Sequence, residues 1–374
     1  MSFEYEKLEN VCEILDSQRV PITEKDRKPG IYPYYGANGV QDYIDDFIFD
    51  DELVLLAEDG GNFGSKDKPI AYRVSGKCWV NNHAHVLKAK DNIDIDYLCY
   101  SLMFYNTNGF VNGATRQKLT QIAMRQMLIP LRKKDVQLKI VKKINLIFQL
   151  IGKRKQQLSK LDQLVKSRFV EMFGECKTNP KNWKLLNMED VAVVGSSKRV
   201  FVEELQEDGI PFYRGTEVGA LAEGKNIVPE LYIKEDHYKE LVKATGIPQP
   251  GDLLMPSICP DGRIWVVNTE NPFYFKDGRV LWIHNIDTKF NSTFLLYTLK
   301  DRIVADYLSI ASGTTFAELK IFTLKKCKIF SVPLPLQEQF AAFVQQVDKA
   351  KSSVKQSLEK LETLKKSLMQ EYFG

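Results

Sequence analysis

In two long segments of the chain, the positions that step by four and three are mostly apolar, and the residues between them are mostly polar. The charged exceptions are Arg154 and Arg168 in the first segment and Lys351 and Lys365 in the second. In the first segment, from Val136 to Gly174, the apolar stripe is Ile140, Ile144, Ile147, Ile151, Leu158, Leu161 and Val165. In the second segment, which ends at Gly374, the stripe is Phe340, Val344, Val347, Val354, Leu358, Leu361 and Leu368. Alternating steps of four and three are typical of a coiled-coil seam, so each segment is predicted to be one α-helix of about 38 residues.

A helix with such a continuous apolar stripe needs a partner that covers it. We expect the two helices to pack against each other as an antiparallel coiled coil, because a pseudo-twofold relation between the halves of the chain would reverse one helix against the other. The alternative is that each helix pairs with a separate subunit.

The two halves of the chain repeat each other. Residues 158–174 align without a gap on residues 358–374, and Gly113-Ala114-Thr115 lies at the same offset from Gly313-Thr314-Thr315. Ile129-Pro130-Leu131 matches Val332-Pro333-Leu334 when the offset changes by three. Weaker similarities link Leu8–Val11 with Met188–Val191, Pro33–Tyr35 with Pro211–Tyr213, and Glu52–Leu55 with Asp252–Met255. Such self-similarity predicts a duplicated architecture.

The remaining sequence predicts two globular domains of mixed α/β character, so the fold class is α+β. Short β-branched and aromatic runs separated by Gly, Pro and Asn are typical of strands. The expected strands are Glu52–Ala57, Ala71–Val74, Cys78–Val80, His83–Lys88, Asp252–Met255, Ile264–Asn268 and Val280–Ile283, with helices near Tyr97–Tyr105 and Ser292–Leu308. The domains are expected at 1–131 and 175–331, and the two spacer helices at 132–174 and 332–374.

Composition narrows the class of protein further. A chain of 374 residues is long enough for two domains. It lacks an apolar run of membrane-spanning length, and its six scattered cysteines form no CxxC pair, so we expect a cytoplasmic protein with reduced thiols and no membrane association. The net charge is only +4, but residues 132–174 hold 12 Lys and Arg against 3 Asp and Glu. This excess fits either a solvated helix face or contact with a polyanion.

The ordered combination of motifs resembles a known family. Gly313-Thr-Thr-Phe-Ala-Glu-Leu319, then Val332-Pro-Leu-Pro-Leu-Gln-Glu-Gln339, followed by a long helix and preceded by a similar half, is similar to the DNA-specificity (S) subunit of a Type I restriction-modification system. The resemblance covers essentially the whole chain. In the first half the Pro-Leu-x-x-Gln region reads Ile129-Pro-Leu-Arg-Lys-Lys134, which departs from the family pattern.

The resemblance implies a protein that recognises double-stranded DNA and performs no chemistry itself. Each target-recognition domain would read one half of a bipartite, asymmetric target, and the coiled coil would set the distance between half-sites. Two modification (methyltransferase) subunits would dock on this scaffold and carry S-adenosylmethionine, and restriction subunits would complete a nuclease. The chain itself is expected to bind no cofactor. The other function considered is a coiled-coil scaffold that joins two protein partners without reading DNA.

Base edges and phosphates are contacted mainly by Arg, Lys, Asn, Gln, Ser and Thr, so loops rich in these residues are the candidate DNA contacts. The candidates in the first domain are Lys66, Lys68, Arg73, Asn81, Asn82, His83, Arg116, Gln117 and Lys118. The candidates in the second domain are Ser196, Ser197, Lys198, Arg199, Arg214, Thr216, Arg263, Thr314 and Thr315. For each of them the competing interpretation is an ordinary solvated side chain.

Motifs for catalysis, nucleotides and metals are incomplete. Gly219–Asn226 imitates a phosphate-binding loop, but Asn226 replaces the required Ser or Thr and a turn is expected there. Asn271-Pro272-Phe273-Tyr274 lacks the second proline of an amino-methyltransferase motif. His83 and His85 would share one face of a strand and could bind a metal, but a packed or DNA-contacting histidine is the favoured interpretation. No catalytic residue and no metal site is therefore expected.

Overall fold

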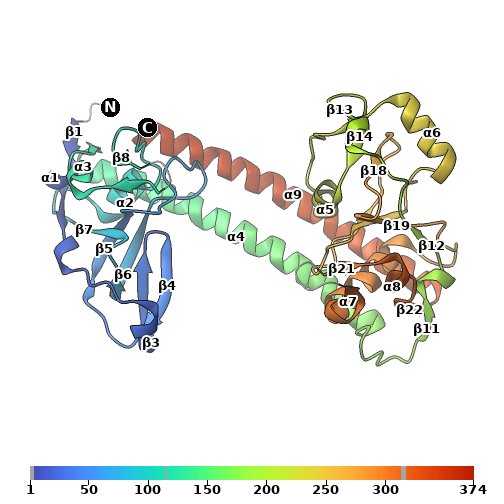
Figure 1. Cartoon of the computed structure of the whole chain (residues 1–374). Coiled ribbons are helices and arrows are strands. Elements are labelled where there is room, and N and C mark those ends of the chain that lie inside the picture. Colours follow the sequence, from blue (N-terminus) through green and yellow to red (C-terminus); the bar gives the residue numbers. More distant parts are fainter. Residues whose placement is uncertain (1–3, 114–115, 313–316) are drawn as a thin grey trace. The chain divides into compact units, whose positions relative to one another are not determined.

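The structure is a computed structural model that describes residues 4–113, 116–312 and 317–374. It separates into two compact units, which we treat one at a time. Unit 1 comprises residues 1–157 and 354–374, and unit 2 comprises residues 158–353. Each of the two long helices, α4 (Lys134–Phe173) and α9 (Leu334–Phe373), contributes one part to each unit (Figure 1).

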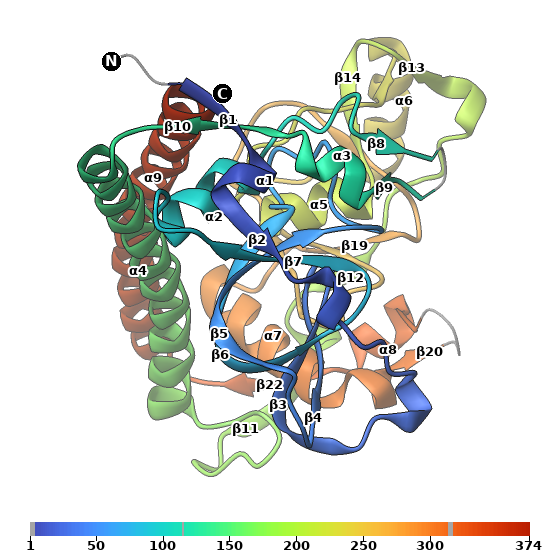
Figure 2. The same ribbon diagram turned by 90° about the vertical axis from the view of Figure 1, so that its left-hand side faces the viewer.

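Unit 1 is built around one mixed sheet. Its strands and helices before α4 are β1 (Glu4–Lys7), α1 (Leu8–Val11), β2 (Cys12–Ile14), η1 (Asp16–Gln18), η2 (Glu24–Asp26), β3 (Pro29–Gly36), β4 (Gly39–Ile44), β5 (Phe49–Ala57), β6 (Ala71–Val80), β7 (Ala84–Ala89), α2 (Ile95–Met103), β8 (Val111–Asn112), β9 (Lys118–Leu119), α3 (Gln121–Arg125) and β10 (Leu128–Leu131). Six strands form the sheet in the order β2-β7-β5-β6-β3-β4 (Figure 2). Neighbours are antiparallel except β3 and β6, which are parallel.

The central strand β5 explains why the sheet is buried on both faces. Val54 and Leu56 enter the core that contains α2, whereas Leu53 and Leu55 enter a second core on the other face. All four side chains are fully buried, because successive residues of a strand point to opposite faces. The two strands expected at 71–74 and 78–80 are one strand, β6, in which Gly76 has a positive φ of 75°.

The start of α4 and the end of α9 complete unit 1 and run antiparallel. Lys143 Nζ lies 3.3 Å from the Tyr372 hydroxyl, and Lys155 forms an ion pair of 3.3 Å with Glu362. A later residue of α4 thus contacts an earlier residue of α9, as two antiparallel helices require. Phe373 packs edge-on against Tyr97 of α2, with ring centroids 5.1 Å apart. The globular part of unit 1 is thereby packed onto both helices.

Unit 2 is built around two four-stranded sheets. Its elements between α4 and α9 are β11 (Lys184–Asn187), η3 (Met188–Asp190), β12 (Val193–Gly195), η4 (Val202–Glu204), β13 (Leu205–Gln206), β14 (Ile210–Tyr213), α5 (Gly215–Ala222), β15 (Tyr232–Ile233), α6 (Glu235–Thr245), β16 (Leu253–Pro256), β17 (Trp265–Val266), β18 (Tyr274–Phe275), β19 (Val280–His284), α7 (Ser292–Ile310), β20 (Ala311–Ser312), β21 (Glu318–Leu319), α8 (Ile321–Lys325) and β22 (Lys328–Ser331). The sheet orders are β12-β19-β16-β17 and β13-β15-β14-β18.

An aromatic cluster joins the helices of unit 2. Phe173, near the end of α4, lies edge-on to Phe294 of α7 at 4.9 Å and to Phe340 of α9 at 5.5 Å. All three rings are fully buried. Asp162 of α4 forms a 2.7 Å ion pair with Lys351 of α9, so the two helices are antiparallel in this unit as well.

The expected seam residues line the contact between the helices. Nine of the fourteen are buried, and the other five, Leu158, Leu161, Leu358, Leu361 and Leu368, are partly buried. The charged seam residues Lys351 and Lys365 keep only 17% and 16% of their side chains exposed, and ion pairs with Asp162 and Glu362 neutralise them. The coiled coil therefore accommodates its charges by pairing them.

Two local expectations need correction. The turn expected over Gly219–Asn226 is only partly right, because a turn lies at residues 223–224 but residues 219–222 belong to helix α5. Val218 of this helix is buried, and Glu217 accepts a hydrogen bond of 2.8 Å from the Arg214 N–H at the start of the helix. The proline-based match between Ile129–Leu131 and Val332–Leu334 is wrong. β10 and β22, which occupy the same place in the two units, are offset by 200 residues with no shift, since Ile129 pairs with Glu6 as Ile329 pairs with Leu186.

The corrected alignment reveals a duplicated glutamine. The fully buried Gln137 accepts a hydrogen bond of 2.7 Å from the Asp94 N–H and donates to the carbonyl oxygens of Asn92 (3.1 Å) and Arg132 (2.7 Å). The fully buried Gln337 makes the same three bonds, with Asn291 (2.8 Å), Lys289 (3.0 Å) and Val332 (2.7 Å). The first half therefore keeps the glutamine of the Pro-Leu-x-x-Gln pattern. In each unit it ties a long helix to the N-cap residue of the helix that packs on it.

Across the residues that the structure describes, no helix combines the length and the apolar character needed to span a bilayer.

Candidate functional site

A polar cavity of about 500 Å³ opens on unit 1 where several loops meet. Four of the sequence-predicted DNA contacts, Asn81, Asn82, His83 and Arg116, line it together. The first three lie on the loop between β6 and β7, and Arg116 lies two residues before the start of β9. The wall is completed by Arg27 and Tyr34, by Asn38 and Gln41 at the β3–β4 turn, and by Asp59 and Gly60 after β5. Amide, imidazole and guanidinium groups are the ones that contact base edges and phosphates.

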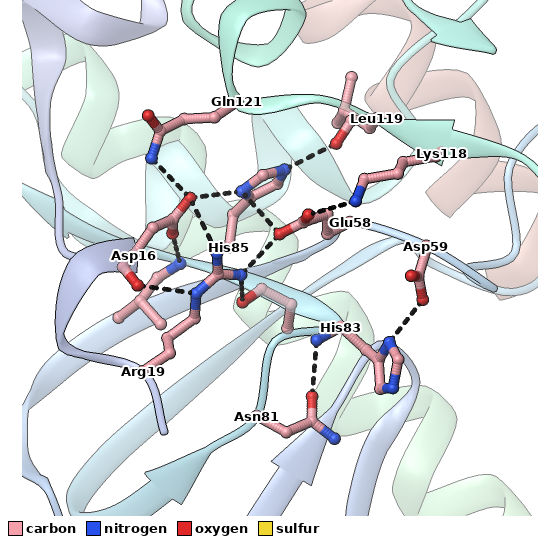
Figure 3. Close-up of polar contacts among 12 residues, drawn as sticks. Asp16, Arg19, Glu58, Asp59, Asn81, His83, His85, Lys118, Leu119 and Gln121 are labelled. Carbon is pink, nitrogen blue, oxygen red and sulfur yellow. Dashed lines mark hydrogen bonds and ion pairs between the residues drawn. The ribbon is translucent and has the colours of Figure 1, made fainter. Parts of the chain in front are cut away.

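Hydrogen bonds fix the floor of the cavity. Asn81 is 97% buried, and its amide donates to Gln41 Oε1 at 3.0 Å while its Oδ1 accepts the His83 N–H at 2.8 Å. His83 Nδ1 lies 2.6 Å from Asp59 Oδ1, as Figure 3 shows. Arg116 Nη2 contacts the same Asp59 oxygen at 2.7 Å. The rigid asparagine thus positions the histidine, and one carboxylate holds both the histidine and the arginine.

Behind this cavity lies a buried network of charges. Asp16 Oδ2 lies 2.6 Å from His85 Nδ1, and Arg19 donates at 2.7 Å to Glu58, which also pairs with Lys118 at 3.0 Å (Figure 3). Burial would raise the pKa of Asp16, but hydrogen bonds from His85, the Val86 N–H and Gln121 outweigh it and lower that pKa. The same balance, with Arg19 and Lys118 as donors, lowers the pKa of Glu58.

Both ring nitrogens of the fully buried His85 have polar partners. Its Nε2 lies 2.9 Å from the carbonyl oxygen of Leu119, and its Nδ1 lies 2.6 Å from the carboxylate of Asp16. The imidazole therefore leaves no polar atom unsatisfied inside the network. The network ties β7 to the Leu119 carbonyl and so supports the loop on which Arg116 lies.

Asp16, Glu58 and His85 place potential metal-ligand atoms within 4.8 Å of one another. Both nitrogens of His85 already make hydrogen bonds, and the cations Arg19 and Lys118 neutralise the carboxylates. This donor set does not fit a divalent cation, which needs free ligand atoms. His83 and His85 also diverge, because His83 contacts Asp59 at the cavity while His85 is buried behind it.

The charged network belongs to unit 1 alone among the described parts of the two repeats. The pairing of Ile14 with Leu87 corresponds to that of Val194 with Ile283, which places Ser196 where unit 1 has Asp16 and Leu281 where it has His85. The Leu119 N–H donates to the Glu58 carbonyl at 2.7 Å, and the Leu319 N–H donates to the Ser257 carbonyl at 2.8 Å. Ser196, Ser257 and Leu281 of unit 2 thus occupy the places of Asp16, Glu58 and His85. The backbone is shared, but the chemistry beneath the candidate surface differs.

The other unit 1 candidates lie outside the cavity wall. Arg73 donates to Asp96 at 2.8 Å and also pairs with Glu52, so it joins α2 to the sheet. Lys66 and Lys68 are exposed on the loop after β5, and Gln117 and Lys118 are exposed beside Arg116. The structure therefore gives Arg73 a structural role.

The unit 2 candidates form two groups. Ser196 and Ser197 donate to the carbonyl oxygens of Val280 (2.6 Å) and Phe275 (2.5 Å), whereas Lys198 and Arg199 are exposed on the same loop. The two serines thus hold the loop, and the two cations are available on its surface.

The second group lies around α5. Arg214 pairs with Glu217 at 2.6 Å, and Thr216 donates to Glu217 at 2.9 Å. Arg263 pairs with Asp261 at 2.9 Å, and its Nη1 would lie 3.0 Å from a Cβ added to Gly219 of α5. A glycine therefore leaves room for the guanidinium. Thr314 and Thr315 lie outside the described residues.

Sequence reasoning missed several residues of the cavity, among them Asn38, Gln41 and Asp59. Asn38 precedes Gly39, and this pair is typical of a tight turn. Such a local signal does not indicate which other segments of the chain lie next to the turn. Asp59 follows the last residues of β5, and an isolated bridge pairs its backbone with Lys118. Only the tertiary pairing of segments about 60 residues apart brings these groups together.

Comparison with known proteins gives consistent likenesses. The family model "Type I restriction modification DNA specificity domain" matches residues 2–162 and again 180–363. A protein assigned as specificity subunit S.HindORF215P of a Type I restriction enzyme of Haemophilus influenzae is 30% identical over 360 residues, which is 95% of this chain and 90% of that protein.

Two solved structures share the fold. The S subunit of a Type I restriction-modification system from M. genitalium aligns with a TM-score of 0.60 at 13% identity, over 100% of this chain and 96% of that one. A chain from a study of complex assembly and conformational transition of the Type I system aligns with a TM-score of 0.55 at 16% identity, over 99% and 97% of the two chains.

Proposed function

The chain belongs to the Type I restriction-modification DNA specificity family and carries its domain twice, and on that basis we propose that the cavity of unit 1 contacts one half of a bipartite duplex target. The observation that carries this proposal is the convergence of Asn81, Asn82, His83 and Arg116 on one cavity. Asparagine pairs with adenine edges and arginine with guanine edges or phosphates. A buried Asn81 and a fixed His83 supply the rigidity that discrimination between bases requires.

We propose that unit 2 reads the other half-site with different chemistry. Arg263 and the exposed pair Lys198 and Arg199 are its strongest candidates. The replacement of the unit 1 ion network by Ser196, Ser257 and Leu281 supports this difference, because the surface above a charged network and that above a neutral core present different fields. An asymmetric target follows from two unlike reading surfaces on one repeated scaffold.

The proposal extends to partners. The chain acts without catalysis of its own, in a complex with two modification subunits that bind S-adenosylmethionine and methylate adenine, and with restriction subunits. The number two is supported by the duplication of the scaffold, since each unit offers the same glutamine-held junction of a domain and a long helix. Membership of the family disfavours the alternative of a scaffold that reads no DNA.

The test is co-expression with candidate modification subunits from the same source, followed by single-molecule sequencing of methylated adenines in the host DNA. A two-part asymmetric motif that appears only with the chain supports the proposal. Asn82→Ala should then relax one half of the motif, whereas Asn92→Ala, at an exposed asparagine outside the cavity, should leave both halves intact. Unchanged methylation in the presence of the chain would overturn the proposal.

A further inference from the structure

Asp59 stands out in the cavity because it presents a negative charge where DNA is expected. One of its oxygens contacts both Arg116 at 2.7 Å and His83 at 2.6 Å. We propose that Asp59 is a specificity-determining residue, which holds Arg116 in an ion pair so that only a base contact of the correct target releases it. This inference rests on the proposed function of the unit 1 cavity.

The two partners differ in mobility. Only 18% of the Asp59 side chain is exposed, and its backbone pairs with Lys118 in a bridge between two segments. The Arg116 side chain is 62% exposed. The carboxylate is therefore held in place, whereas the long guanidinium side chain can swing to another acceptor. A carboxylate and a phosphate each offer an arginine acceptor oxygens for charge-assisted hydrogen bonds.

The energetic balance explains how such a pair favours the target. An exposed ion pair contributes little free energy in water. Arg116 therefore gains little when it exchanges Asp59 for a phosphate of a random duplex, where it again forms an exposed ion pair. A two-point contact with a base edge is worth more than an exposed ion pair, so it outweighs the cost of breaking the pair with Asp59. Asp59 thus suppresses non-target binding more than target binding, which is specificity through a repulsive element.

The same arrangement recurs in unit 2. Arg199 pairs with Asp277 at 3.3 Å and Arg263 pairs with Asp261 at 2.9 Å. Candidate DNA-contacting arginines of both units are therefore held by carboxylates. Unit 1 is the better place to test the inference, because Asp59 holds a histidine and an arginine of the same cavity at once.

The experiment measures duplex binding by the full chain, co-purified with its modification subunits, across a range of salt concentrations. Four forms are compared: wild type, Asp59→Asn, Arg116→Ala and the double variant. Asp59→Asn should tighten binding to a duplex without the target motif by about threefold to fivefold, as loss of one surface ion pair allows. It should also steepen the plot of log affinity against log salt by about 0.9, because one more cation reaches a phosphate. Target affinity should rise less, so discrimination falls.

Arg116 separates this mechanism from a general charge effect. In the double variant, the slope for the duplex without the motif should return to the wild-type value, since the released cation is gone. Arg116→Ala alone should leave that slope unchanged and weaken target binding. Asp67→Asn is the matched control, because Asp67 is an acid of the same unit paired with Lys366 at 3.0 Å. It should leave the slope unchanged.

The outcomes that overturn the inference are specific. If the wild-type complex prefers its target but Asp59→Asn leaves the salt slope unchanged, the inference is overturned and the proposed function stands. An equal change of slope in Asp59→Asn and in the control Asp67→Asn also overturns the inference. If circular dichroism shows that Asp59→Asn does not fold, the salt slope of Arg116→Ala tests the inference instead. A slope shallower by about 0.9 for the duplex without the motif would show that Arg116 already contacts phosphate in the wild type, which overturns the inference. Absence of target preference in the wild-type complex overturns the proposed function, and the inference with it.

Discussion

Replacing Gln137 by alanine removes the amide that joins helix α4 to the N-cap of α2. Three hydrogen bonds of 2.7, 3.1 and 2.7 Å are lost, and the side chain that made them is fully buried. At about 1 kcal/mol for each bond, the loss is about 3 kcal/mol, and the partly buried Asp94 N–H that loses its acceptor adds to it. Gln337→Ala should cost a similar amount, because it breaks the same three bonds in unit 2.

Hydrogen exchange measured by mass spectrometry detects this loss where it occurs. A destabilisation of about 3 kcal/mol corresponds to about a hundredfold faster exchange in the segment that contains the Asp94 amide. Gln149→Ala, at an exposed position of the same helix, is the matched control and should change stability by less than about 0.5 kcal/mol. A Gln137→Ala protein that exchanges no faster than this control would refute the idea that the amide anchors the helix to the globular part.

Three further predictions concern stability and reactivity. Burial would raise the pKa of Glu217, but hydrogen bonds from Arg214 and Thr216 outweigh it and lower the pKa to about 2, so its stabilising effect is present above pH 4.5 and is lost as the pH falls toward 2. The difference in unfolding free energy between wild type and Glu217→Gln should shrink over that range, and a difference independent of pH would contradict the assignment. His85→Leu should cost about 3 to 5 kcal/mol in urea unfolding, because the buried carboxylate of Asp16 loses its partner. Adding Asp16→Ser and Glu58→Ser, the unit 2 residues, should recover most of this loss; no recovery would refute the equivalence of the two sites. Finally, burial raises the pKa of all six thiols, so a maleimide should label the native chain far more slowly than the urea-unfolded chain, and equal rates would contradict their burial.

The sequence predicted the elements whose signal is local and periodic. The stripe from Ile140 to Val165 lines the helix contact, since a helical period is set by neighbouring residues. The strand at Glu52–Ala57 was recognised from its β-branched and apolar residues, although β5 begins earlier, at Phe49. The turn expected at Gly219 is a helix because tertiary burial of Val218 overrides the low helix propensity of glycine.

The cavity was only partly predictable for a different physical reason. Asn81, Asn82 and His83 are adjacent in sequence, so composition alone marked them. Asp59 contributes because the chain returns at Lys118 and Arg116 to the end of β5, and that pairing depends on the whole sheet. Aligning Pro130 with Pro333 gives an offset that does not place Gln137 opposite Gln337. The pairing of β1 with β10 and of β11 with β22 gives an offset of 200 residues, at which the two glutamines are equivalent.

The central claim is that the two units read different halves of one target. The direct measurement is single-molecule sequencing of methylated adenines in cells that carry the modification subunits and either Arg116→Ala or Arg263→Ala. We expect each variant to relax or abolish recognition in one half of the motif, and the two variants to affect opposite halves. If both variants altered the same half, or neither altered the motif while assembly stayed intact, this account of DNA recognition would be contradicted.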